Sequence, residues 1–167
     1  MLLVACSAEG DADQEPPPSP NMPQGVEFPG VEAPSAAQQA LLSSTDCRTV
    51  AEGYFEALGA GDFALAARFW DDPLVDAARL DTLLRDYTTP EFTIDTVQEE
   101  GAAGSMFCTV TGALADAGVP SSPLRQGQIV LRRVNDVPGA TPEQLRWHVQ
   151  SSTFVEEMQR AGRGSPA

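Results

Sequence analysis

The cysteines are the side chains of this sequence whose placement points most clearly to chemistry. The chain has three of them, at positions 6, 47 and 108. A thiol can act as a nucleophile, join a second thiol in a disulfide, or bind a metal. Metal binding has little support, because no two cysteines lie at short spacing and His148 is the single histidine. The remaining options, a modified thiol and a disulfide, depend on where the protein resides.

The residues before Cys6 indicate that location. They resemble the end of a bacterial lipoprotein signal peptide, in which an aliphatic residue and two small or short residues precede a cysteine: Leu3, Val4, Ala5 and Cys6. The resemblance implies that the Cys6 thiol receives a diacylglycerol and that the chain is cut before it. Residues 1–5 carry no charge and would be the remnant of a longer signal peptide. The alternative is an accidental match around an ordinary thiol.

An acidic, proline-rich stretch follows Cys6. Residues 1–45 contain six acidic residues, no basic residue and seven of the fourteen prolines. Such a stretch buries too little apolar surface to offset the entropy of ordering it. We expect a disordered tether over about residues 7–34, and we assign residues 6–44 to the lipidated cysteine and its tether. A folded domain over 45–155 and a polar tail over 156–167 would complete the chain.

The charge of the chain restricts its partners. The formal net charge is −14, and all ten basic residues are arginine. Such a chain repels nucleic acid, so no nucleic-acid partner is expected. The sequence also has no phosphate-binding glycine loop and no nucleophile-elbow motif, and we assign no cofactor, metal site or catalytic residue. The expected membrane attachment is the lipid anchor alone.

Hydrophobic periodicity predicts the fold of the remaining chain. Helical spacing of apolar residues appears in three segments, residues 45–59, 63–70 and 74–87. Period-two alternation follows in four segments, residues 92–96, 106–112, 128–134 and 145–154. We therefore expect an α+β domain with about three N-terminal helices packed on a curved, mostly antiparallel sheet of about four strands. This element order, with Gly61-Asp62-Phe63 between the first two helices, resembles the nuclear transport factor two-like (SnoaL-like) family over residues 45–154.

That resemblance implies a cone-shaped domain with an internal pocket, which in enzymes of the family holds an aspartate or histidine as general base. The candidates here are Asp95 and His148. Both fall on the strand phase opposite the apolar residues, so we expect them to be exposed. Four aromatic residues could line the pocket, although rings at such spacing more often form plain core: Tyr54, Trp70, Phe92 and Trp147.

Cys47 and Cys108 would pair if the protein is exported, since disulfides persist outside the cytoplasm and lipidation of Cys6 leaves two thiols. Cys108 shares a strand face with Met106 and Val110, and Cys47 begins the first helical stripe. We expect a disulfide between the first helix and the second strand. Two separate buried thiols are the alternative.

Three functions fit these features. The preferred hypothesis is a lipid-anchored cell-envelope protein that faces the periplasm or exterior and whose domain binds a protein or small molecule without catalysis. An enzyme of the same fold, acting on a hydrophobic small molecule, is the second. The third is a structural spacer.

Overall fold

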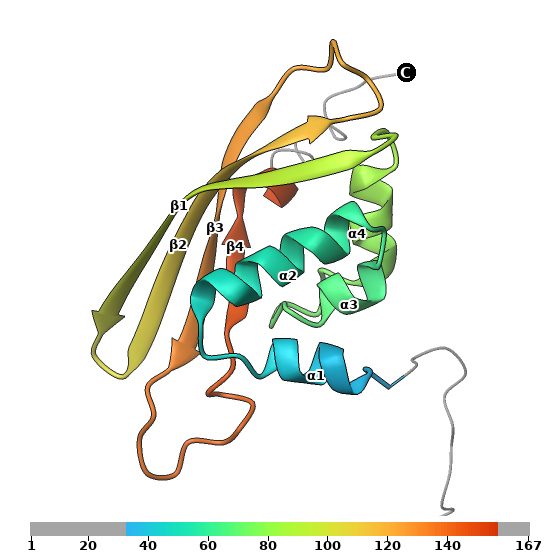
Figure 1. The fold of residues 1–167 in the computed structure, drawn as a ribbon. Helices are drawn as coiled ribbons and strands as arrows, with labels where there is room; N and C mark the ends of the chain where they lie inside the picture. The colour runs from blue at the N-terminus through green and yellow to red at the C-terminus, as the bar shows by residue number, and fades with distance from the viewer. Residues whose placement is uncertain (1–32, 157–167) are drawn as a thin grey trace, which may run out of the picture. The chain divides into compact units, whose positions relative to one another are not determined.

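The computed structural model describes residues 33–156, and these form helices packed on one face of a four-stranded antiparallel sheet (Figure 1). The predicted α+β class and antiparallel sheet are confirmed. Cys6, the expected tether as far as residue 32 and the tail from residue 157 lie outside this range. No helix between residues 33 and 156 is both long and apolar enough to cross a membrane.

The first helix, α1 (Ala36–Leu42), was not predicted. It begins at a capping box in which the Ser35 hydroxyl accepts from the Gln38 amide and the Gln38 side chain accepts from the Ser35 amide. The Leu41 side chain occupies the space that a Cβ atom on Gly53 would need. Because Gly53 has no side chain, α1 packs closely against the helix that contains it. The expected tether, drawn to residue 44, therefore includes a helix, and the expected count of three helices is too low.

The three expected helices are present with shorter bounds: α2 (Cys47–Gly59), α3 (Phe63–Ala67) and α4 (Ala77–Leu84). An aspartate precedes each one and accepts a hydrogen bond from a backbone amide in the first turn. Asp46 bonds the Thr49 amide, and Asp62 and Asp76 act in the same way. Helix α2 is the longest and its buried stripe, which includes Val50, Tyr54 and Leu58, faces the sheet.

The strands are β1 (Pro90–Ala102), β2 (Ser105–Asp116), β3 (Arg125–Val134) and β4 (His148–Ser152), and they pair in that order. Strand β1 therefore forms one edge of the sheet. At the other edge, β4 meets a short extended segment at the Trp70–Val149 bridge. Strand β1 is longer than predicted, because the chain turns only at Gly104, where φ is +79° and a residue without a side chain is favoured.

Strand β1 contains a β-bulge beside Gly112 of β2. Ile94 pairs with Gly112 and Thr96 pairs with Thr111, so Asp95 is the extra residue. A Cβ atom on Gly112 would overlap the carbonyl oxygen of Thr93. Glycine is therefore required for the two backbones to approach at the bulge.

We expect Gly112→Ala to lower the free energy of unfolding by about 1–3 kcal/mol, because the backbone must shift to admit the methyl group. Gly101→Ala is the matched control, since its Cβ would meet only the Met106 sulfur at 3.6 Å. The control should stay within about 0.5 kcal/mol of the parent. Urea unfolding of both variants measures the difference, and equal midpoints would contradict the prediction.

Candidate binding groove

A disulfide between Cys47 and Cys108 fixes α2 on the sheet. The two Cα atoms are 6.5 Å apart, and both residues are fully buried. The predicted pairing of the first expected helix with the second strand is confirmed. Glu99 lies beside the two sulfur atoms and pairs with Cys108 in the β1–β2 ladder, so the three residues have the spacing of a metal site. The disulfide removes the thiolates that a metal would need, so these sulfurs form a structural link.

His148 is buried, in contrast to the expectation from strand alternation. Its Nε2 atom lies 3.0 Å from the Glu143 carbonyl oxygen, and its Nδ1 atom lies 2.8 Å from a carboxylate oxygen of Asp71. The Nδ1 contact has the distance of an ion pair but lies outside hydrogen-bond geometry. The loop after α3, through Asp71, and the loop before β4, through Glu143, cover the imidazole, and alternation alone does not show which loops cover a strand. Asp95 is exposed, as expected.

The four aromatic residues that could line a pocket differ in their burial and location. Tyr54 and Trp147 are fully buried in the core, the placement that rings at such spacing more often have, and neither lines the groove described next. Trp70 is half-buried and its Nε1 donates to the Tyr54 hydroxyl at 3.1 Å, while Trp147 Nε1 donates to the Thr45 carbonyl at 2.9 Å. Burial raises the pKa of Tyr54 far above its usual range. Phe92 alone of the four lines the groove described next.

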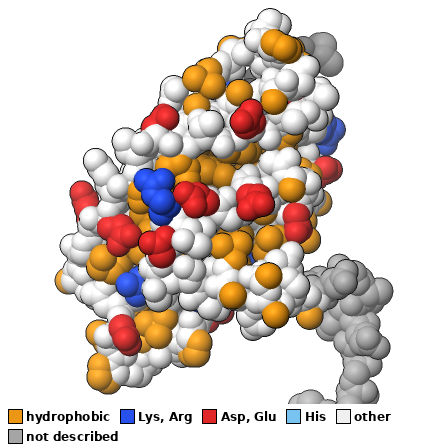
Figure 2. Space-filling view, in the orientation of Figure 1, with side chains coloured by type: hydrophobic (Ala, Val, Ile, Leu, Met, Phe, Trp, Pro, Cys, Tyr) orange, Lys and Arg blue, Asp and Glu red, His pale blue; other side chains and the backbone are white. Residues whose placement is uncertain are grey.

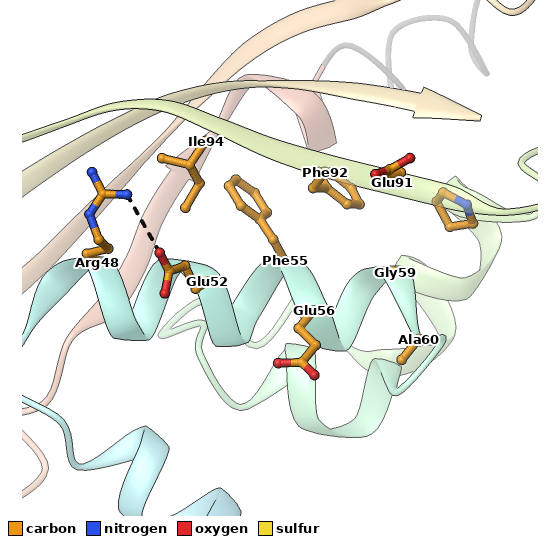
Figure 3. Close-up of a pocket in the computed structure, with 10 residues that line it drawn as sticks. Arg48, Glu52, Phe55, Glu56, Gly59, Ala60, Glu91, Phe92 and Ile94 are labelled. Atoms are coloured by element: carbon orange, nitrogen blue, oxygen red, sulfur yellow. Dashed lines mark ion pairs between the residues drawn. The ribbon is translucent and has the colours of Figure 1, made fainter. Parts of the chain in front are cut away.

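A groove of about 640 Å³ lies between α2 and β1, within the usual size range of ligand sites (Figure 3). Helix α2 supplies one wall and the start of β1 the other. Its lining residues are Arg48, Glu52, Phe55, Glu56, Gly59, Ala60, Pro90, Glu91, Phe92 and Ile94.

Stacked aromatic rings form the floor of the groove. The rings of Phe55 and Phe92 are almost parallel, at 5° and a centroid distance of 5.0 Å, and Phe154 meets both of them edge-on. Phe55 points from α2 toward β1, between Phe92 and Ile94 (Figure 3). Phe92 and Ile94 are half-buried, so part of their apolar surface remains open to a partner.

The rim of the groove is acidic. Three exposed carboxylates stand there, on Glu52, Glu56 and Glu91, against one guanidinium, on Arg48. Arg48 Nη1 is 3.6 Å from Glu52 Oε1 in an exposed ion pair. Figure 2 shows the same arrangement on the surface, where hydrophobic side chains gather above α2 and basic and acidic side chains border them.

Strand β1 presents its open edge beside this groove. Within the part of the chain described, residues 90–102 make no backbone hydrogen bond outside the β1–β2 ladder.

Asp116, at the end of β2, holds the segment that leads into β1, because its carboxylate accepts from the Thr88 and Thr89 amides at 2.8 Å and from the Gly118 amide at 3.0 Å. These N–H groups lower the pKa of the Asp116 carboxyl.

A second hollow, of about 720 Å³, lies between α1 and the segment before β4. Arg146 crosses it and is already bonded, since its Nε donates to the Leu42 carbonyl and its Nη1 to the Glu143 carboxylate. This hollow lacks the aromatic floor of the α2–β1 groove. We therefore take the α2–β1 groove as the candidate site.

Sequence reasoning identified Phe92 but missed the α2 residues that complete the groove. Phe55 was among the aromatic residues whose spacing is compatible with a ligand cavity but is more often that of plain core. No known family model matches the chain, and no curated protein shows significant similarity to it. The resemblances to lipoproteins and to the nuclear transport factor two-like family stay predictions.

Proposed function

We propose that this protein is a lipid-anchored cell-envelope protein whose folded domain binds a partner in the α2–β1 groove and performs no catalysis. The observation that carries the binding function is the half-buried apolar surface of Phe92 and Ile94, which stays partly open to solvent above the buried ring of Phe55 and beside the edge of β1. Apolar surface kept accessible in this way is typical of a binding site.

The cell-envelope part of the proposal is supported by two features. Residues 3–6 match the lipoprotein pattern that ends in Cys6. The Cys47–Cys108 disulfide is typical of proteins that fold in an oxidising compartment. Together they favour a domain held outside the cytoplasm by acyl chains on Cys6.

The enzyme alternative has less support in the geometry. Catalysis by a general base needs an ionisable side chain that contacts the bound molecule and is shielded from water. The charged side chains that line the groove stand on its exposed rim, and His148 is enclosed by Asp71 and Glu143 instead. A structural spacer would not need apolar surface that stays accessible in a groove, so the spacer alternative does not explain this feature.

A neutral apolar probe tests the binding site. We expect indole, titrated into the ¹⁵N-labelled, non-lipidated full-length chain, to shift amide resonances of α2 and of residues 91–94. Ile94→Glu should weaken this binding about tenfold, because a carboxylate would enter the apolar floor. Leu74→Glu is the control, since Leu74 is 75% exposed and lies outside the groove. Shifts that cluster elsewhere would overturn the assignment.

A further inference from the structure

We propose that the α2–β1 groove binds an extended, basic polypeptide segment, which pairs with the open edge of β1 as a fifth strand and places apolar side chains on Phe92 and Ile94. This inference rests on the proposed binding function of the groove and names the class of partner.

The backbone of β1 supplies the first argument. In an antiparallel pair, alternate residues direct their N–H and C=O groups to the neighbouring strand, and the residues between them direct theirs outward. Among residues 33–156, strand β1 has a neighbour only on its β2 side. Residues 91–94, which flank the groove, therefore present outward groups that another strand can bond.

The side chains on the helix side of β1 supply the second argument. Phe92 and Ile94 are two residues apart, so they lie on the same face of the sheet and approach Phe55 from above. An added strand would lie about 4.8 Å beyond β1 and would place every second side chain on that face. Those side chains would enter the groove between β1 and α2, where an apolar residue covers the open floor.

Charge decides the chemistry of the other residues of the partner. Side chains on the opposite face of an added strand would lie across from Glu91, and those at the groove mouth would meet Glu52. Strand β1 also carries Asp95, Glu99 and Glu100 and no basic residue. Opposite charges on neighbouring strands stabilise pairing and like charges oppose it, so the partner should carry lysine or arginine.

The same charges disfavour two other occupants. A second copy of the chain that paired through its own β1 would set acidic side chains of both strands against each other, and the bulge at Asp95 would interrupt the register. The N-terminal residues 7–32 of this chain carry six acidic residues and no basic one, so the rim would repel them. A basic segment is the occupant that the charges favour over both of these.

The test uses a capped heptapeptide, KVRLKVR, in which apolar and basic residues alternate, titrated by calorimetry into the non-lipidated full-length chain. We expect binding that brings peptide amide protons close to those of residues 91–94 in nuclear Overhauser spectra. Methylation of alternate peptide nitrogens should weaken binding about tenfold or more, because it removes the donors to β1. The acidic counterpart EVELEVE should not bind.

Charge variants of the protein give a second measurement. The double variant Glu52→Gln/Glu91→Gln should weaken peptide binding several-fold and reduce its dependence on salt between about 50 and about 500 mM. Glu100→Gln is the matched control, because Glu100 is exposed on the same strand but lies outside the groove. It should change the affinity much less.

The outcomes separate this inference from the proposed function. If indole binds in the groove but the heptapeptide does not, or if its N-methylated form binds equally well, strand addition is wrong and the binding site remains. If neither probe binds, both proposals fall. A concentration-dependent dimer joined through residues 90–94 would make a second copy the occupant and overturn the assignment to a basic partner.

Discussion

Removal of the disulfide by Cys47→Ala/Cys108→Ala is expected to lower the free energy of unfolding by about 4 kcal/mol. The bond joins residues 61 positions apart, and in the chain-entropy model a closed loop of this length restricts the unfolded chain by that amount. Domains of this size are commonly stable by about 5–15 kcal/mol, so the loss is a large part of the total. Urea unfolding at equilibrium gives the measurement.

Reduction of the parent protein separates the cross-link from the packing of the two side chains. Both proteins carry Cys6→Ser for this comparison, so that Cys6 cannot react. A reductant should lower the unfolding midpoint of the parent and leave the Cys47→Ala/Cys108→Ala variant unchanged. Two free thiols in the denatured, unreduced parent would contradict the prediction directly.

Cys6→Ser is expected to move the protein from the membrane fraction to the soluble periplasmic or culture fraction. Each buried methylene of an acyl chain contributes about 0.8 kcal/mol to membrane binding, and two or more chains give a stable anchor. Serine has no thiol to accept the diacylglycerol. The measurement is fractionation of cells that express the gene with its natural upstream sequence. That upstream sequence, read in frame with Leu2, also shows whether a basic segment and an apolar run precede it.

Ser7→Ala is the control for this experiment, because it changes the neighbouring residue and keeps the thiol. It should remain with the membrane. A Cys6→Ser protein that still sediments with membranes would place the anchor elsewhere in the protein.

Periodicity was sufficient to predict the elements that bury one clear face. The stripe of α2, with Val50, Tyr54 and Leu58, and the alternation of Ile129 and Leu131 in β3 each mark a single buried side, and the structure has both. Helix α1 was missed because its seven residues lie within proline-rich and acidic neighbours, and composition averaged over that stretch hides a short capped helix. The Ser35 capping box was the local signal that could have revealed it.

The site was less predictable than the fold, because it depends on contacts between distant segments. Phe92 was named as a pocket residue, but the groove exists only because β1 is an edge strand and α2 lies beside it. Strand alternation placed His148 on the face opposite the apolar residues and predicted that it would be exposed. The side chain is buried instead, because Asp71 and Glu143 cover it from loops. Tyr54 and Trp147 show the converse, because rings that could line a cavity fill the core instead.

The position of the disulfide also determines how the domain would carry mechanical load. In the proposed arrangement, tension from the membrane enters the folded domain through α1, which is short and would detach first. At Cys47 the pull reaches a covalent bond to β2, a strand with hydrogen-bonded neighbours on both sides. The force then passes to the interior of the sheet, and α2 is not peeled away from its first residue. The groove between α2 and β1 would keep its shape while the tether is stretched.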